Sequence, residues 1–496
     1  PCPPDNLTSS HIIDWNVVPP LEIWRDKVKF NSPSTAQLTR SSVPSPSDLR
    51  ALFNGRVIAP DDPRYESART VFYGGVDRRP AAIIKVADAG DVSRLVKLAN
   101  EYGFELAVRS GGHSTAGHST TEGGIVLDLS AMKDLRVSLE DKTAWAETGL
   151  TAGEYTSVVS KHGLATGFGD TGTVGLGGIT LGGGIGFLVR KYGLTIDSLL
   201  AAEVVIADGQ LLHVDENSYP DLFWAIRGGG GNFGVATRFK FQLHEVDMVF
   251  GGMLFLPATP DTIAAFMTEA ESAPEELSTI ANVMTAPPMP FLPADLHGKP
   301  IIMAMMVYAG NPVDGERVVA PFRALAKPYA DMLRPMHYPE MYPPEEGGDY
   351  HPVAAARTMF LDHVDRSVAQ FILDRLATST ASMAVTQLRV LGGAMARVPV
   401  EATAFAHRKS RIMANVAALY GNPAEKETHE AWAKNFAAAL RQSDGGAYVN
   451  FLGDEGGAQV HAAYPGRTWE RLAAIKAKYD PTNLFRLNQN IPPSGG

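Results

Sequence analysis

The sequence contains a single cysteine, Cys2, and this excludes an internal disulfide and any metal cluster built from cysteines. It has no apolar run of about eighteen residues, which is the length that a membrane-spanning helix needs. Its net charge of −10 leaves no excess of basic residues to attract a nucleic acid or an anionic membrane. We therefore expect no metal ion, no nucleic acid and no membrane among its partners.

The 496 residues are more than one compact core accommodates, and the residue pattern changes along the chain. Residues 1–50 are rich in proline, serine and threonine, have no sustained period and are interpreted as an N-terminal extension. Short strand and helix patterns alternate over 51–247. Beyond that point methionine and proline become frequent, and long helical patterns over 259–272 and 364–380 indicate a second domain.

Two local patterns are specific enough to predict individual elements. The pair Asp208-Gly209 lies between two apolar runs and predicts a hairpin over 200–214. The strict alternation over 384–391 predicts a strand, and it places Gln387 and Arg389 on the same face. That face either lines a pocket for a polar or anionic substrate or lies in solvent.

Glycine is concentrated in the segment 167–186, where every second residue on average is a glycine. Because glycine costs conformational entropy on folding, this density indicates a backbone that lies flat against a large ligand. The phosphate-binding pattern GxxxxGK[ST] is absent. A GxGxxG pattern at 229–234 follows a helical segment and leads into a strand, the reverse of the order in nicotinamide-binding Rossmann domains. The ligand is therefore expected to bind in a different fold.

Five motifs in a fixed order give the sequence its strongest resemblance. Together they resemble the vanillyl-alcohol-oxidase superfamily, and they are most similar to its branch of berberine bridge enzymes and hydroxynicotine oxidases. The motifs are RSGGHS (109–114), GTVGLGGITLGGGIG (172–186), KYGLTIDSL (191–199), DLFWAIRGGGGNFGVAT (221–237) and FRLNQNIPP (485–493).

The resemblance implies an α+β fold in which a two-part FAD-binding domain surrounds an inserted substrate domain. It places the first part of the FAD-binding domain at 51–247 and its C-terminal return at 455–496. Residues 248–454 then form the substrate domain, which is an antiparallel sheet covered by helices.

The resemblance also implies a cofactor, FAD, bonded through its 8α-methyl group to the histidine of RSGGH, which is His113. Relatives with a second bond use a cysteine where this chain has Thr171, so a single covalent bond is expected. Arg190 or Lys191 is expected to add charge near the pyrophosphate, and His118 is a further candidate near the flavin. The residues expected to bind FAD are Arg109, Ser110, Gly111, Gly112, His113, Ser114, Thr171, Gly172, Thr173, Gly175, Gly178, Gly182, Gly183, Gly184, Gly186, Gly234, Val235, Asn488 and Asn490.

The catalytic groups are less well defined, because many relatives carry a YxNY motif whose second tyrosine lies near flavin N5. Here the segment reads Tyr448-Val449-Asn450-Phe451, so that tyrosine is replaced by Phe451. Tyr448 is a candidate base, expected to share a strand face with Asn450, and is equally compatible with a structural role. Gln387 and Arg389 are the other catalytic candidates.

These features predict an oxidase that removes a hydride from a C–H bond next to an alcohol or amine of a small organic molecule. Its partners would be that substrate and O₂, which yields H₂O₂. A flavin dehydrogenase with another electron acceptor, or a flavin-binding protein without catalysis, is the alternative. We expect a monomer or homodimer in the cytoplasm, with secretion left open because the first residue given is Pro1 rather than methionine.

Overall fold

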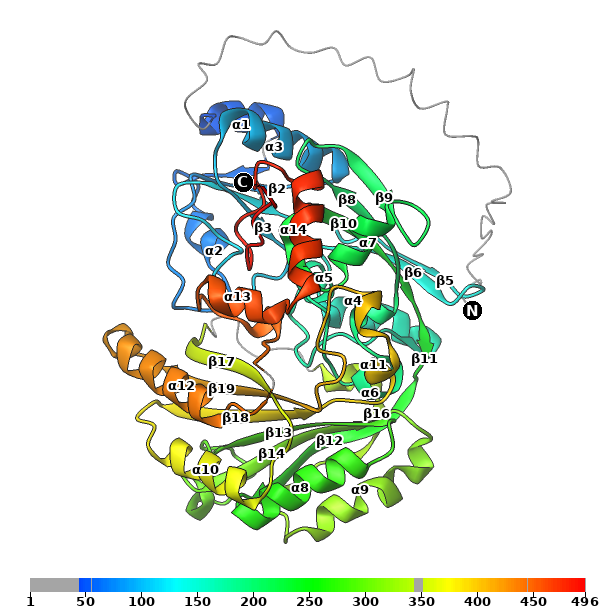
Figure 1. Cartoon of the computed structure of the whole chain (residues 1–496), viewed down its shortest axis with the longest axis vertical. Helices are drawn as coiled ribbons and strands as arrows, with labels where there is room; N and C mark the ends of the chain where they lie inside the picture. Colours follow the sequence, from blue (N-terminus) through cyan, green and yellow to red (C-terminus); the bar gives the residue numbers. More distant parts are fainter. Residues whose placement is uncertain (1–43, 55, 343–350, 444, 496) are drawn as a thin grey trace, which may run out of the picture. The chain divides into compact units, whose positions relative to one another are not determined.

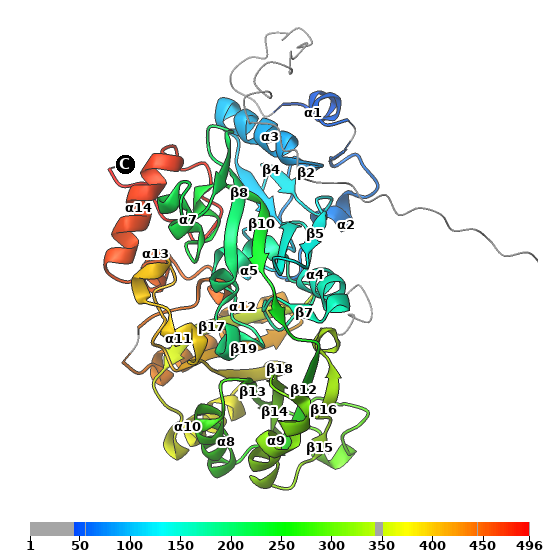
Figure 2. The same cartoon turned by 90° about the vertical axis from the view of Figure 1, so that its right-hand side faces the viewer.

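The computed structural model describes residues 44–54, 56–342, 351–443 and 445–495. The N-terminal extension expected at 1–50 therefore lies outside the described residues, apart from the start of α1 (Pro46–Leu52). Three larger sheets organise the described chain, as Figures 1 and 2 show from two directions.

The first sheet has four strands in the order β1-β2-β4-β3, and its last three strands run parallel. Helix α3 (Ala89–Tyr102) packs against it through Val92, Leu95 and Val96. The helix begins two residues before the predicted 91–102 segment, because the Asp88 carboxylate caps the Asp91 amide at 2.9 Å. The strands are β1 (Val57–Ile58), β2 (Ala82–Lys85), β3 (Leu106–Arg109) and β4 (Ile125–Asp128).

The second sheet has five antiparallel strands in the order β5-β6-β10-β8-β9. It contains the predicted hairpin, in which β8 and β9 pair across a turn that ends at Gly209, φ +81°. Both sheets lie in the upper part of Figure 1, next to the C-terminal helix α14 (Arg467–Tyr479). The strands are β5 (Leu135–Ser138), β6 (Thr143–Glu147), β8 (Leu199–Val205), β9 (Leu211–Val214) and β10 (Val235–Gln242), and helices α4 (Ala152–Val159), α5 (Leu176–Leu181) and α7 (Pro220–Ile226) accompany them.

The third sheet has eight antiparallel strands, in the order β15-β12-β14-β13-β18-β19-β17 with β16 paired to β12. Four helices cover one of its faces (Figure 1), and apolar side chains such as Leu254, Val283 and Leu388 fill the space between. The strands are β12 (Met248–Pro257), β13 (Leu277–Thr285), β14 (Pro300–Tyr308), β15 (Ala330–Asp331), β16 (Arg334–His337), β17 (Val353–Leu361), β18 (Met383–Val390) and β19 (Ile412–Tyr420), and the helices are α8 (Pro260–Ser272), α9 (Gly315–Ala324), α10 (Arg366–Ala377) and α12 (Lys426–Leu440).

This arrangement confirms the predicted fold class, with an antiparallel sheet covered by helices beside a mixed α/β portion. The strand predicted at 384–391 is β18, and the helices predicted at 259–272 and 364–380 are α8 and α10. The domain boundaries at 247 and 454 stay predictions.

Two arginines hold residues 190–197, which follow the glycine-rich segment, to the part of the chain that forms the eight-stranded sheet. Arg190 is buried at the carboxyl end of α8, where its guanidinium donates to the carbonyls of Ala270, Ala273 and Leu277 at 2.8–2.9 Å. A cation at this position also opposes the partial negative charge of the helix end. Neighbouring Lys191 donates to the Ala309 carbonyl. Both side chains are therefore engaged with the sheet portion, not with a pyrophosphate site.

The second arginine, Arg408, is fully buried and forms a two-point ion pair with Asp197, with N–O distances of 2.7 and 2.8 Å. It also donates to the Thr403 hydroxyl at 2.8 Å. Buried ion pairs contribute little relative to apolar packing, yet removing one partner leaves the other charged and desolvated.

We therefore expect Arg408→Ala to lower the free energy of unfolding by about 3–5 kcal/mol, because the Asp197 carboxylate loses its buried counter-charge. Arg397→Ala is the matched control, since Arg397 is 62% exposed in its pair with Glu275 and such pairs contribute about 1 kcal/mol or less. Thermal and urea unfolding of the two variants measures the difference. Equal losses of stability in both variants would contradict this account of Arg408.

Candidate active site

A cavity of ≈ 620 Å³ lies between the glycine-rich loops and the face of the eight-stranded sheet that its helices leave uncovered. The loop 110–115 and the segment 169–179 form part of its wall. Strands β17, β18 and β19 contribute another part, through residues such as Ala356, Gln387 and Asn415. The segments 448–452 and 487–489 complete the wall, so residues far apart in sequence meet around one space.

Two loops cross without side chains between them, and this crossing forms one end of the cavity. A Cβ atom on Gly111 would lie 2.2 Å from the Gly175 amide nitrogen, and a Cβ on Gly175 would lie 2.1 Å from that of Gly111. Only glycine permits this approach. Ser110 fastens the crossing, because its hydroxyl donates to the Thr148 carbonyl at 2.5 Å and accepts from the Gly177 amide at 3.2 Å.

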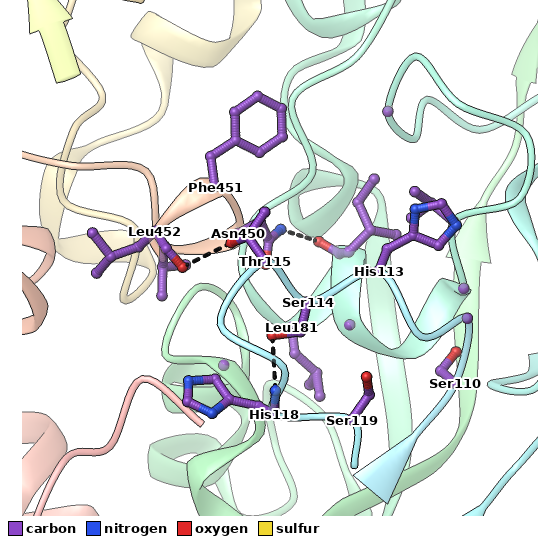
Figure 3. A pocket seen from close by; sticks show the side chains of 18 of the residues that line it. Ser110, His113, Ser114, Thr115, His118, Ser119, Leu181, Asn450, Phe451 and Leu452 are labelled. Carbon is purple, nitrogen blue, oxygen red and sulfur yellow. Dashed lines mark hydrogen bonds between the residues drawn. The ribbon is translucent and has the colours of Figure 1, made fainter. Parts of the chain in front are cut away.

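His113 follows directly on this crossing and is half-buried on the cavity wall. Its imidazole stacks on the ring of Phe72, with centroids 4.1 Å apart and planes at 20°. Figure 3 shows His113, Ser114 and His118 on one loop, beside Asn450 and Leu452 of a later segment. The Thr115 hydroxyl joins the two segments by donating to the Leu452 carbonyl at 3.2 Å.

Two charged residues line the cavity among the described residues, Asp170 of the segment 169–179 and Arg389 of β18. The Arg389 guanidinium donates to an Asp170 oxygen at 2.6 Å and to Gln387 Oε1 at 2.7 Å. It lies 5.1 Å from the ring centroid of Phe451 and is only 3% exposed. Because its charge is compensated by Asp170, Arg389 does not offer a free cation to an anionic substrate.

Tyr448 also lies on the cavity wall, and its phenol oxygen accepts three hydrogen bonds. The donors are the amides of Gly184 and Ile185 at 3.0 and 3.2 Å and the side chain of Asn450 at 2.9 Å. Burial raises the pKa of Tyr448, and the three donors act in the opposite direction. The phenol therefore holds the glycine loop 182–185 against the segment 448–451.

The segment 448–451 differs from the expected strand. Residues Val449–Phe451 form a 3₁₀ turn, so Tyr448, Asn450 and Phe451 all reach the cavity wall instead of dividing between two faces. The Asn450 side-chain amide donates to the Ile179 carbonyl and to the Tyr448 phenol oxygen. These two bonds hold the segment in place of the backbone hydrogen bonds of the expected strand.

Most residues predicted from the sequence lie on the cavity wall. They are Ser110, Gly111, Gly112, His113, Ser114, Thr171, Gly175, Gly178, Gly234, Val235, Gln387, Arg389, Tyr448 and Asn488.

The others lie away from this wall and contact protein. Arg109 forms a buried ion pair with Asp128 at 2.9 Å. The glycine cluster 182–186 packs against protein, since a Cβ on Gly184 would lie 1.9 Å from the Thr195 hydroxyl and one on Gly186 would lie 1.7 Å from the Phe168 carbonyl. The predicted residues away from the wall are Arg109, Gly172, Thr173, Gly182, Gly183, Gly184, Gly186 and Asn490.

Sequence reasoning missed several polar residues of the wall, chiefly Asp170 and Asn415. Asp170 is the one acid in the segment 167–186, and this isolation among glycines and apolar residues is the signal that indicates it. Asn415 interrupts the apolar pattern of β19, a weaker signal, because a single polar residue in a strand usually faces solvent.

Comparison with known proteins agrees with this geometry. The model of an FAD binding domain matches residues 80–215, and the model named "Berberine and berberine like" matches 447–492. The chain is 31% identical to (R)-6-hydroxynicotine oxidase of Paenarthrobacter nicotinovorans, an alignment that covers 89% of this chain and 97% of that protein. The chain belongs to the berberine-bridge family of FAD-linked oxidoreductases.

Further relatives of this FAD-linked oxidoreductase have similar coverage. An uncharacterized FAD-linked oxidoreductase of Bacillus subtilis is 30% identical over 89% of this chain and 98% of its own. The crystal structure of 6-hydroxy-D-nicotine oxidase from Arthrobacter nicotinovorans superposes with a TM-score of 0.79 at 27% identity, covering 88% of this chain and 98% of that one. Glucooligosaccharide oxidase of Acremonium strictum, whose FAD is described as 6-S-cysteinyl and 8α-N1-histidyl, shares the fold at a TM-score of 0.79 and 24% identity, with 91% and 99% covered.

These matches confirm FAD as the cofactor, and the cavity of this oxidoreductase fits it. Buried polar atoms on the wall without a hydrogen-bond partner among the described residues include His118 Nε2, Ser119 Oγ and the Tyr464 hydroxyl. Buried polar groups almost always have partners, so these atoms indicate a polar ligand. A Cβ on Gly178 would project into open space, which leaves room for a flat ring.

The charges of the wall determine how an anionic pyrophosphate is held. Arg389 is paired, and burial lowers the pKa of His118 to about 4, so that imidazole is neutral at neutral pH. Backbone amides of the loop 110–115 are therefore the donors suited to the phosphates, since the Ser110 and Thr115 hydroxyls already donate to carbonyls.

Within the described residues, no group of three or more histidine, cysteine or acidic side chains is arranged to hold a metal ion. No helix in the same part of the chain is long and apolar enough to cross a bilayer.

We expect Tyr448→Phe to lower the free energy of unfolding by roughly 2 kcal/mol or more and to reduce FAD content, because two buried amides lose their acceptor. Tyr155→Phe is the matched control: Tyr155 is equally buried, but its hydroxyl has one side-chain partner, Thr166, and its loss costs about 1 kcal/mol. Thermal unfolding and the flavin-to-protein absorbance ratio measure both effects. A Tyr448 variant as stable as the Tyr155 variant would show that the phenol does not hold the loop.

Proposed function

We propose that the protein is an FAD-dependent oxidase that removes a hydride from a C–H bond next to an alcohol or amine of a small organic substrate. Two electrons and two protons leave the substrate and are passed to O₂, which becomes H₂O₂. When bound, FAD supplies the hydride acceptor and the reactivity toward O₂. Side chains of the cavity wall bind the substrate and accept its heteroatom proton.

One observation supports this reaction above all: a single carboxylate faces the same cavity as His113 and the glycine loops. One oxygen of Asp170 accepts from Arg389, and the other has no protein partner among the described residues. A carboxylate in this position is suited to accept the heteroatom proton as the hydride leaves carbon. Arg389 and Gln387 act as positioning residues, because they fix the carboxylate and do not themselves carry the proton.

Tyr448 has a different part in this proposal. Its oxygen is occupied by three donors and its pKa is raised by burial, so it supports the flavin loop while Asp170 takes the proton. Phe451, which replaces the tyrosine of the family motif, packs over the Arg389 guanidinium. The replacement of that tyrosine is thus accompanied by the Arg389–Asp170 ion pair next to Phe451.

The oxidase activity is tested in two steps. The protein is first mixed with a panel of small alcohols and amines under anaerobic conditions, and air is then admitted. We expect one of these compounds to bleach the flavin, and air to restore the colour with release of H₂O₂. Asp170→Asn keeps the acceptor for Arg389 but not the base, and is expected to slow bleaching at least about a hundredfold. Bleaching without recovery in air would indicate a dehydrogenase, and bleaching of Asp170→Asn at the wild-type rate would remove Asp170 from the mechanism.

We also propose that FAD is bonded to the protein once, through His113. The imidazole lies half-buried on the wall, and Thr171, on the same wall, has no thiol to form a second bond. In the native protein the yellow colour is expected to remain with the acid-precipitated pellet, and in His113→Ala it is expected to pass into the supernatant. His118→Ala is the matched control, from which any bound flavin stays in the pellet. A white wild-type pellet would disprove the bond without affecting FAD binding.

A further inference from the structure

An aromatic ring covers one face of the histidine to which the proposed function attaches FAD. The phenyl ring of Phe72 is stacked on the imidazole of His113, with centroids 4.1 Å apart and planes inclined by 20°. Tyr73 packs edge-on against the same phenyl ring, with centroids 5.0 Å apart. Phe72 and His113 are both half-buried and both lie on the cavity wall. The stack is therefore a feature of the cavity and not of an apolar core.

Backbone hydrogen bonds fix the position of Phe72 from two sides. The Phe72 amide donates to the Gly112 carbonyl at 3.2 Å, next to the stacked histidine. The Phe72 carbonyl accepts from His351 Nδ1 at 3.3 Å. Two residues further on, the Gly74 amide donates to the Pro352 carbonyl at 3.1 Å. The phenyl ring is thus held by main-chain bonds to two distant parts of the chain.

This geometry orients the imidazole without blocking its nitrogens. The lone pair of an imidazole nitrogen lies in the plane of the ring, and Phe72 covers a face of the His113 ring, not its edge. Turning the imidazole out of this plane gives up a favourable aromatic contact. A nucleophile that is already oriented reacts faster, because the entropy cost of ordering it does not add to the barrier. Phe72 therefore restricts His113 to orientations in which its nitrogens point past the edge of the stack.

We propose that Phe72 is a positioning residue for the covalent attachment of FAD and that it acts through His113. This role rests on the proposed bond between His113 and the 8α-methyl group. When that bond forms, an imidazole N–H bond and a methyl C–H bond break and an N–C bond is made. The two electrons and two protons released reduce O₂ to H₂O₂. Phe72 accelerates this attachment and has no part in the later oxidation of substrate.

The test follows bond formation in time. The whole chain is purified from a host short of riboflavin and incubated with FAD in air, and samples are precipitated with trichloroacetic acid at intervals. Flavin in the pellet is bonded, and flavin in the supernatant is not. We expect Phe72→Leu to form the bond roughly tenfold more slowly than wild type at saturating FAD, because the imidazole is no longer held in one orientation.

Tyr192→Leu is the matched control, because Tyr192 is stacked on His244 in nearly the same way. The centroids are 4.1 Å apart and the planes are inclined by 15°, and neither residue is among the described residues of the cavity wall. Its loss removes a similar aromatic contact, so the rate of bond formation is expected to stay within about twofold of wild type.

Two further variants at position 72 separate the ring from the volume that it fills. Phe72→Tyr keeps the ring and is expected to restore the wild-type rate. Phe72→Met fills a similar volume without a ring, so it is expected to be as slow as Phe72→Leu. It also replaces Phe72→Leu in the comparison if that variant folds poorly.

The dependence of the rate on FAD concentration distinguishes positioning from a general loss of structure. Positioning lowers the maximal rate, while the FAD concentration that gives half of that rate stays within about twofold. A wild-type maximal rate in both Phe72→Leu and Phe72→Met, or weaker FAD binding as their only change, would overturn the role of Phe72 and leave the bond in place. A wild-type protein that retains no flavin in the pellet would overturn the bond itself, and the role of Phe72 with it.

Discussion

The backbone contact between Gly111 and Gly175 is the constraint on which the rest of the site depends. Each residue leaves no room for a Cβ atom on the other, so two loops from distant parts of the sequence meet without side chains between them. Ser110 fixes the contact from one side through Thr148 and Gly177. The position of His113 and the edge of the cavity both follow from this crossing, because His113 is two residues away from it.

A second constraint is electrostatic. An acidic chain binds a cofactor whose pyrophosphate is itself anionic, and the one cation on the described wall is already paired with Asp170. The basic residues nearest in sequence to the glycine segment do not serve the phosphates, since Arg190 and Lys191 bind carbonyls of the sheet portion. Oriented backbone dipoles are then the remaining source of positive potential, and this gives the glycine-rich loops a role beyond close packing.

Motifs and periodicity predicted many of the helices, strands and cavity-wall loops, because both patterns depend on local backbone geometry and on contact with a ligand. The hairpin at Asp208-Gly209, the strand β18 and the loop 110–114 on the cavity wall all have such signals. The glycines 182–186 belong to the motif at 172–186, which was also expected to bind FAD. The structure places them against Thr195 and Phe168, because glycine density does not distinguish a ligand from neighbouring chain. The turn at 449–451 was expected as a strand, since alternation over four residues does not reveal that Asn450 bonds to Ile179 and Tyr448.

Two of the residues that the sequence analysis did not identify, Asn282 and Asn415, have positions that depend on strand register, as does that of the predicted Gln387. Asn282, Gln387 and Asn415 are separated by many residues, and nothing in the sequence indicates that they form one row. Within that row Gln387 is held by Asn282 and Arg389, whereas Asn415 Oδ1 has no hydrogen-bond partner among the described residues. The bonds from Gln387 to Arg389 and from Arg389 to Asp170 form a fixed network that preserves the geometry of the Asp170 carboxylate, on which the proposed proton transfer depends.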